Sequence, residues 1–233
     1  MNTNNNTYTV IYTTVICVLV AAILALVSQS LKPRQEANEK AETASQILAA
    51  AQFADKAELQ KMGNAAIIKL YNDNIDQDAE VLSVSALKAL NYRIKAGEDV
   101  AIPTYRFKNG VKVIPVYGAG LWGPVWGYIA VDDADGISIV GAYFDHESET
   151  PGLGGKIKDD PSFRASFKGE KIGSDSANPF DIVKGGSPAG DFGDSKVDAI
   201  TGATMTSKGL DAAMDVWLGA YVKSSAKEDP RDE

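Results

Sequence analysis

The sequence has one cysteine and one histidine among its 233 residues. The lone cysteine, Cys17, excludes a disulfide within the chain, and the lone histidine, His146, excludes a histidine-rich metal cluster. Basic side chains are also few, because 23 Lys and Arg residues stand against 31 Asp and Glu residues and leave a formal net charge of −8. Nucleic-acid-binding proteins usually present a basic face, so this balance argues against a nucleic-acid partner.

Charge is absent from the first 31 residues. From Val10 to Ser28 the chain is apolar except for two threonines and the final serine, and a helix of this length crosses about 30 Å of hydrocarbon. A cleaved signal peptide is the alternative, but the segment lacks both a basic start and a small-x-small cleavage site. We therefore predict an N-terminal tail at 1–9 and an uncleaved transmembrane anchor at 10–31.

Two helical segments are predicted after the anchor. The segments at 34–53 and 55–75 are rich in helix-forming residues, and the first has an apolar stripe near its end. We place a helical stalk at 32–60 and a folded domain at 61–225, followed by a charged C-terminal tail at 226–233.

From about Val81 the pattern changes to short β-type runs separated by turn residues. Asn109-Gly110, flanked by such runs, predicts a hairpin, and the runs that follow predict an antiparallel meander. After Gly155 we expect a Gly/Ser/Pro-rich segment at 185–194, a short strand at 196–200 and an amphipathic helix from about Thr206 to Val222. The predicted fold class is therefore α+β: an N-terminal transmembrane helix and stalk, then a mainly antiparallel sheet packed with helices.

The stretch DAITGATMTSKG, from Asp198 to Gly209, has four hydroxyl side chains but no strong nucleophile. It lies between the predicted strand and the start of the last helix. Small residues there let a ligand approach the backbone, and a helix N-terminus favours an anion such as phosphate. A helix cap formed by Thr204 or Thr206 explains the same residues equally well, so the spacing leaves both interpretations open. The small residues and hydroxyl donors of this stretch are Thr201, Gly202, Ala203, Thr204, Thr206 and Ser207.

A second candidate, HESETPGLGGKI at 146–157, follows a predicted strand, where loops commonly carry function. Glu147 and Glu149 are spaced to act as an acid/base pair, although solvation at the surface explains them as well. His146 with Glu149 is too small a set for a metal site. No nucleophile, base and orienting group occur in order, so a hydrolase triad is weakly supported.

The third candidate is GAGLWGPVWGYIA at 118–130, where two tryptophans lie among glycines. Trp122 and Trp126 could frame a flat aromatic ligand or form part of the core of the sheet. On the residues alone we favour core packing.

These three segments, in their order along the chain behind an apolar span, resemble the covalent FMN-binding family that includes a membrane-anchored subunit of the sodium-translocating NADH:quinone oxidoreductase. The resemblance extends along nearly the whole chain. The family's motif is Asp-x-x-(Ser/Thr)-Gly-Ala-(Thr/Ser)-x-Thr. It is matched here by Asp198, Thr201, Gly202, Ala203, Thr204 and Thr206.

The resemblance implies that 61–225 is an FMN-binding domain and that FMN is joined through its phosphate to Thr206. A dedicated flavinyltransferase is expected to install it from FAD while recognising Asp198 and the turn, so Thr206 need not be reactive by itself. The same resemblance makes Trp122 the aromatic neighbour of the flavin and Thr201, Thr204 and Ser207 supports of the turn and phosphate. The further candidate flavin contacts are Glu149, Thr150, Leu153 and Gly154.

The implied function is electron transfer within a multi-subunit, sodium-pumping NADH dehydrogenase of the bacterial inner membrane. The sequence has no G-x-G-x-x-G fingerprint after an early strand, so NADH should be oxidised in another subunit. One alternative is the equivalent subunit of the ion-translocating ferredoxin:NAD oxidoreductase. The other is a non-redox, membrane-anchored module that binds a phosphorylated ligand reversibly.

The resemblance and the charge pattern disagree about orientation. Lys32 and Arg34 follow the span, so the positive-inside rule would leave the folded domain in the cytoplasm. The family is expected to hold its flavin domain on the periplasmic side. Two charges beside one anchor are weak evidence, so we expect a single-pass protein with a periplasmic domain.

Overall fold

The computed structural model describes residues 6–76, 80–134, 136–185 and 195–228. The chain divides into two compact units, Met1–Lys40 and Ala41–Glu233. The first element, α1 (Asn6–Ala50), contains the boundary between them.

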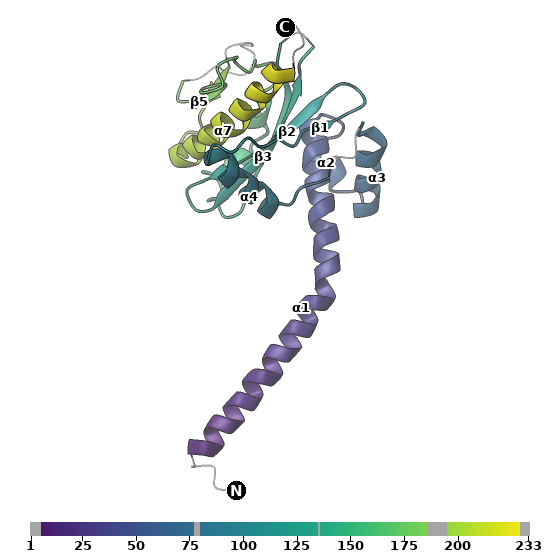
Figure 1. Cartoon of the computed structure of the whole chain (residues 1–233), viewed down its shortest axis with the longest axis vertical. Helices are drawn as coiled ribbons and strands as arrows, with labels where there is room; N and C mark the ends of the chain where they lie inside the picture. Colours follow the sequence, from purple (N-terminus) through teal and green to yellow (C-terminus); the bar gives the residue numbers. More distant parts are fainter. Residues whose placement is uncertain (1–5, 77–79, 135, 186–194, 229–233) are drawn as a thin grey trace. The chain divides into compact units, whose positions relative to one another are not determined.

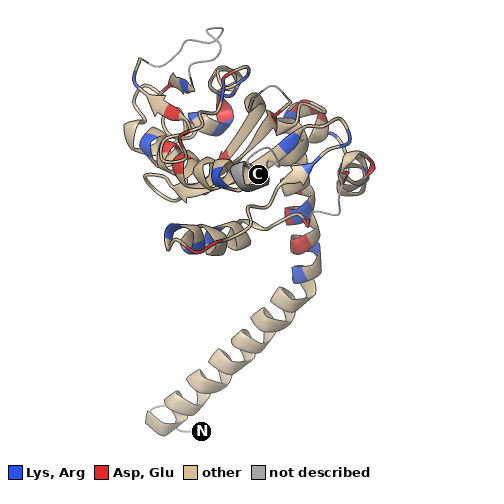
Figure 2. Ribbon diagram, turned by 45° about the horizontal axis from the view of Figure 1, so that its top comes forward, with Lys and Arg blue, Asp and Glu red and all other residues tan. Residues whose placement is uncertain are grey.

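In the part of the chain that the structure describes, α1 is the one helix long and apolar enough to cross a membrane. None of its most apolar 18-residue window is buried against the rest of the chain, and Figure 2 shows no charged residue along that part of the helix. The hydroxyls of Thr13 and Thr14 donate to the carbonyls of Thr9 and Val10, each at 2.8 Å. These bonds satisfy polar groups that a hydrocarbon environment would leave without partners.

The predicted tail, anchor and stalk are not separate elements, because α1 begins at Asn6 and continues past Pro33 to Ala50. The helical prediction for 55–75 is correct in type, but the segment is divided into α2 (Lys56–Leu59) and α3 (Asn64–Asn74). Of the predicted C-terminal tail, residues 229–233 lie outside the described residues, and the last helix extends to Glu228.

The prediction of β-type structure from about Val81 is wrong over its first part, which forms helix α4 (Val84–Lys95). Ser83 caps this helix, since its hydroxyl accepts a hydrogen bond from the Ala86 N–H at 3.2 Å. Leu87 is fully buried on the inner face of the helix, and Leu90 and Ile94 pack beside it at helical spacing. The cap and this spacing are both visible in the sequence.

The predicted meander and its Asn-Gly hairpin are confirmed. Strands β1 (Tyr105–Arg106), β2 (Lys112–Ala119), β3 (Pro124–Asp132) and β4 (Ser138–His146) form an antiparallel sheet in the order β1-β2-β3-β4. Gly110 closes the first hairpin with φ of +89°, a conformation that glycine adopts without steric cost.

Both faces of this sheet are covered. On one face, Ile114, Ile129 and Phe144 pack with helix α7 (Thr204–Glu228), which Figure 1 shows lying across β2 and β3. On the other, Val113, Tyr128 and Tyr143 pack with the last residues of α1 and with α2 and α3. The alternation of side chains along each strand divides the core into these two layers.

Helix α1 has different surroundings in the two units. Within the first unit it exposes a continuous apolar surface suited to a membrane. Within the second unit its last turns, including Ile47 and Leu48, are buried with α2 and α3 against the sheet. The composition of the helix changes before this boundary, because its charged residues begin at Lys32, within the first unit.

The segment between β4 and α7 contains several short elements, and local patterns predicted only the last of them. They are α5 (Lys156–Asp159), α6 (Pro161–Ala165), β5 (Asp181–Val183) and β6 (Lys196–Asp198). Only β6 falls within a predicted strand. β5 and β6 pair in parallel, so the small sheet departs from the antiparallel pattern of the main one. Of the Gly/Ser/Pro-rich segment predicted at 185–194, residues 186–194 lie outside the described residues.

Helix α7 approaches the end of β2 closely at two glycines. A Cβ atom added to Gly118 would lie 2.7 Å from the Ala213 Cβ, and one added to Gly209 would overlap the Ala119 carbonyl oxygen. Such overlaps force the backbones apart, so both positions require glycine if α7 is to keep its place on the sheet.

We expect Gly209→Ala to destabilise the protein by about 1–3 kcal/mol through this overlap. The direction of the change in stability is diagnostic, because alanine inside a helix without a clash would stabilise the helix by about 1 kcal/mol relative to glycine. Urea denaturation measures the change, with the exposed Lys208→Ala as a control on the same turn of the helix. A stability equal to or above that of the wild type would contradict the close approach.

Candidate functional site

The motif that begins at Asp198 forms a tight turn between β6 and α7. The Ala203 N–H donates to the Ile200 carbonyl at 3.0 Å and closes the turn. Gly202 has φ of +83° at the third position of this turn, where a side chain would be strained. The glycine of the motif is therefore explained by backbone geometry.

The turn leads directly into α7, which begins at Thr204, two residues earlier than predicted. Thr206 consequently lies inside the first helical turn and is not the cap. The Ser207 hydroxyl accepts a hydrogen bond from the Ile200 N–H at 3.1 Å and ties the turn to the helix. The first N–H groups of any α-helix have no intrahelical acceptor, so this end of α7 favours an anion.

The Thr206 side chain is buried and bonded to a carboxylate. Its exposed fraction is 1%, and its hydroxyl Oγ1 lies 2.5 Å from Oε2 of Glu149, whose exposed fraction is 4%. A distance this short is typical of a charge-assisted O–H···O⁻ hydrogen bond. A residue of the 146–157 loop and the last threonine of the motif therefore meet in the interior.

The turn that precedes β3 holds the other oxygen of Glu149. Oε1 accepts a hydrogen bond from the Trp122 N–H at 2.8 Å. Burial by itself raises the pKa of this carboxyl, but the hydrogen bond from Thr206 and those from the N–H groups of Trp122, Leu121 and Gly123 outweigh it and lower the pKa below its usual value. Glu149 is therefore an ionised carboxylate at neutral pH.

A pocket of about 410 Å³ opens beside this pair. It brings together residues from the three segments singled out in the sequence, and all but Leu121 and Met205 were predicted there. Its lining consists of Leu121, Trp122, Glu149, Thr150, Leu153, Gly154, Gly202, Ala203, Thr204, Met205 and Thr206.

The rim of this pocket is apolar and open to solvent. Trp122 is 68% exposed, so the expectation that it packs in the core is wrong. Trp126 is half-buried, and its indole N–H donates to Gln46 Oε1 at 3.3 Å. Three further apolar side chains are exposed at the pocket, those of Leu121, Leu153 and Met205. Leu121 and Met205 were not predicted, and the feature of the sequence that could have indicated them is that each adjoins a predicted site residue.

Three predicted residues lie away from this pocket. Thr201 and Ser207 line a second cavity, of about 340 Å³, which reaches Ile182 and Lys184. Asp198 accepts a hydrogen bond from the Gly185 N–H at 2.8 Å. The turn therefore has two sides, one toward Glu149 and one toward β5.

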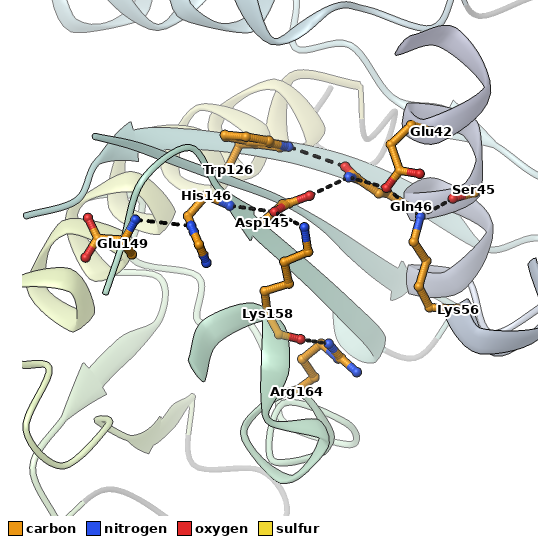
Figure 3. Close-up of polar contacts among 10 residues, drawn as sticks. All are labelled: Glu42, Ser45, Gln46, Lys56, Trp126, Asp145, His146, Glu149, Lys158 and Arg164. Atoms are coloured by element: carbon orange, nitrogen blue, oxygen red, sulfur yellow. Dashed lines mark hydrogen bonds and ion pairs between the residues drawn. The ribbon is translucent and has the colours of Figure 1, made fainter. Parts of the chain in front are cut away.

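A polar network positions the loop that carries Glu149 (Figure 3). The Glu149 N–H donates to Nδ1 of His146 at 3.2 Å. The neighbouring Asp145 is buried, and it accepts from Gln46 of α1 and pairs with Lys158, each at 2.8 Å. The network thereby connects the end of α1 to the strand that leads into the Glu149 loop.

The two glutamates of this loop have different surroundings. Glu147 is exposed whereas Glu149 is buried. The hypothesis that they form an acid/base pair is therefore wrong, because only one of them faces the site.

Comparison with known proteins indicates the class of protein. A family profile of FMN-binding domains matches residues 120–219, a range that includes the pocket and the motif. The chain is 36% identical over 157 residues to a subunit of the Na(+)-translocating NADH-quinone reductase of Vibrio parahaemolyticus, over 67% of this chain and 54% of that protein. It is 28% identical to the corresponding subunit of Pseudomonas aeruginosa, over 94% of this chain and 93% of that protein.

A solved structure extends the likeness to the fold. The crystal structure of the same reductase subunit from Parabacteroides distasonis is 33% identical, with a TM-score of 0.63, over 83% of this chain and 96% of that one. The chain belongs to the NqrC family of Na(+)-translocating NADH-quinone reductase subunits. It spans about half the length of the Vibrio relatives, with 52% and 54% of two of them covered.

The lowered pKa of Glu149 makes stability depend on pH. Because the folded-state pKa lies below the ordinary value of 4.5, the carboxylate stabilises the fold above that pH, and its contribution is lost as the pH falls through the folded-state pKa. Glu149→Gln removes the charged acceptor and should cost about 1–3 kcal/mol at neutral pH. We expect the difference in stability between the wild type and Glu149→Gln to narrow as the pH falls from about 5 to about 3.

Thermal unfolding over this pH range measures the difference, and the exposed Glu147→Gln serves as the matched control on the same loop. A difference that stays constant with pH would show that the Glu149 contribution is not linked to its ionisation.

Proposed function

We propose that the protein is the electron-carrying flavoprotein subunit of a sodium-translocating NADH:quinone oxidoreductase, with FMN covalently attached through its phosphate to Thr206. The observation that carries the proposal is the position of Thr206. This last residue of the motif lies in the first turn of α7 and lines the pocket of about 410 Å³. The names of the relatives in several bacteria support the same assignment.

The residues at this site suit FMN. The pocket volume falls within the range of about 300–1,000 Å³ that is typical of cofactor sites. The start of α7 offers N–H groups and a positive dipole end to a phosphate on Thr206. Gly154 leaves room next to that residue, because a Cβ added there would lie 2.5 Å from the Thr206 hydroxyl oxygen.

The apolar rim suits the isoalloxazine ring. Trp122 and Leu153, together with Leu121 and Met205, present exposed apolar surface that a flat aromatic group would cover. Thr150 adds a polar contact for a ring heteroatom.

The turn serves both the cofactor and the enzyme that attaches it. Gly202 and Ala203 allow close approach to the backbone at the pocket. On the other side of the turn, Asp198 and Thr201 form the surface by which a flavinyltransferase recognises the acceptor, while the buried Ser207 supports the turn through its bond to Ile200.

Bound FMN supplies one- and two-electron chemistry, and this chain contributes its attachment and surroundings. NADH oxidation and ion passage belong to other subunits of the complex in this proposal. The apolar helix α1 anchors the chain in the bacterial inner membrane, with the second unit on the periplasmic side.

The linkage itself is tested with intact mass spectrometry after co-expression with a flavinyltransferase. We expect a mass increase of one FMN minus one water, located on the peptide from Asp198 to Lys208, because Thr206 supplies the ester oxygen. Thr206→Ala should carry no covalent flavin, whereas the matched Thr204→Ala should still be labelled. Label on Thr206→Ala would overturn the attachment site.

The same samples distinguish covalent attachment of the flavin from reversible binding. In-gel flavin fluorescence that follows the denatured polypeptide supports the ester. Flavin that separates from the chain on denaturation favours the non-redox module that binds a phosphorylated ligand.

Orientation is tested with a reporter fused after Glu233. A periplasm-dependent reporter such as alkaline phosphatase should be active, because the proposal places the second unit outside the inner membrane. The control is a cytoplasm-dependent reporter at the same position. If that reporter is active and alkaline phosphatase is not, the second unit lies in the cytoplasm, as the positive-inside rule for Lys32 and Arg34 predicts.

A further inference from the structure

The Thr206 hydroxyl has one hydrogen, and in the structure that hydrogen is directed at Glu149. Oγ1 donates it to Oε2 across 2.5 Å, and both side chains are buried. A hydroxyl that donates its hydrogen keeps its lone pairs for other partners. Because Thr206 also lines the pocket, those lone pairs are available to an electrophile that enters there.

Glu149 is fixed in the orientation that accepts this hydrogen. Its second oxygen is held by the Trp122 N–H at 2.8 Å. Glycines on two sides make room for the carboxylate, since a Cβ added to Gly120 would lie 2.5 Å from Oε1 and one added to Gly154 would overlap Oε2. The backbone of Glu149 is itself held by the bond to His146.

Two other carboxylates of the predicted segments do not line this pocket. Glu147 is exposed, and Asp198 accepts from the Gly185 N–H on the opposite side of the turn. Among the described residues, Glu149 is therefore the carboxylate whose oxygen is bonded to the Thr206 hydroxyl.

We propose that Glu149 is the general base in the flavinylation of its own chain, accepting the Thr206 proton as Oγ1 attacks the flavin-side phosphorus of a flavin adenine dinucleotide. The inference rests on the proposed function, because it concerns how the Thr206 ester is made. The Oγ1–P bond forms and the P–O bond to the bridging oxygen of the pyrophosphate breaks. Adenosine monophosphate leaves with that oxygen and the electron pair, and the proton passes from Glu149 to water, with no change in oxidation state.

A weak base suffices for this step. In protein kinases an ionised aspartate likewise accepts the proton of the hydroxyl that attacks phosphorus. The lowered pKa of Glu149 keeps the carboxylate ionised and ready to accept at neutral pH. The acceptor protein thus contributes a group to the reaction that modifies it, while the transferase binds and activates the dinucleotide.

The test uses the full-length protein in detergent with a purified flavinyltransferase and FAD, and intact mass spectrometry follows the gain of FMN with time. General bases contribute about 10²–10⁴-fold to such steps. We expect Glu149→Gln to lower the kcat of flavinylation by at least about 100-fold while the KM for the acceptor protein stays unchanged. Formate added to Glu149→Ala should restore part of the rate, which loss of a merely structural contact would not produce.

Glu147→Gln, on the same loop, is the matched control and should be modified at the wild-type rate. Unfolding curves verify that each variant is folded. If Glu149→Gln does not fold, Glu149→Asp decides the question. It keeps the charge but withdraws the carboxylate from Oγ1, so a clearly reduced rate supports the proposal and the wild-type rate overturns it.

A folded Glu149→Gln that gains FMN at close to the wild-type rate would place the base in the transferase and overturn the inference, leaving the covalent attachment intact. If the wild-type chain gains no FMN on Thr206, the proposed function fails, and the inference fails with it.

Discussion

The close approach of α7 to the end of β2 is the constraint on which the site depends. Gly118 and Gly209 remove the side chains that would keep the two elements apart. Because the helix lies so near the strand, its first turn reaches the region where β2 leads into the 120–123 turn. Thr206 is buried there together with the loop that follows β4, and one pocket collects residues from three separate segments.

Burial of a carboxylate at that point is tolerated because its oxygens have donors. An ionised group taken from water without partners is strongly unfavourable, and hydrogen bonds from a hydroxyl and from backbone N–H groups compensate for this cost. Glu149 receives both kinds. The arrangement that stabilises the charge also fixes the direction of the Thr206 hydroxyl, so stability and site geometry rest on the same bonds.

Local patterns in the sequence were sufficient for the apolar span, the strands β2 to β4 and the last helix, because the period of hydrophobic residues and the turn residues define such elements directly. The expectation of β-type structure from about Val81 is wrong at α4, although the Ser83 cap and the helical spacing of Leu87, Leu90 and Ile94 indicate a helix there. Local patterns also did not give the parallel pairing of β5 with β6, because the partner of a short strand is set by distant packing.

For the site, too, the sequence accounts for some features and the packing of distant segments accounts for others. The sequence by itself determined which segments contribute, through the motif at 198–206 and the two glycine-rich loops, and it determined that the turn contains small residues. Only the tertiary structure decided that Trp122 lies at the surface, that Glu147 faces solvent and that Glu149 holds the Thr206 hydroxyl. Glu149 and Thr206 are 57 positions apart in the sequence, and hydrogen bonding between such distant positions arises from the packing of α7 on the sheet.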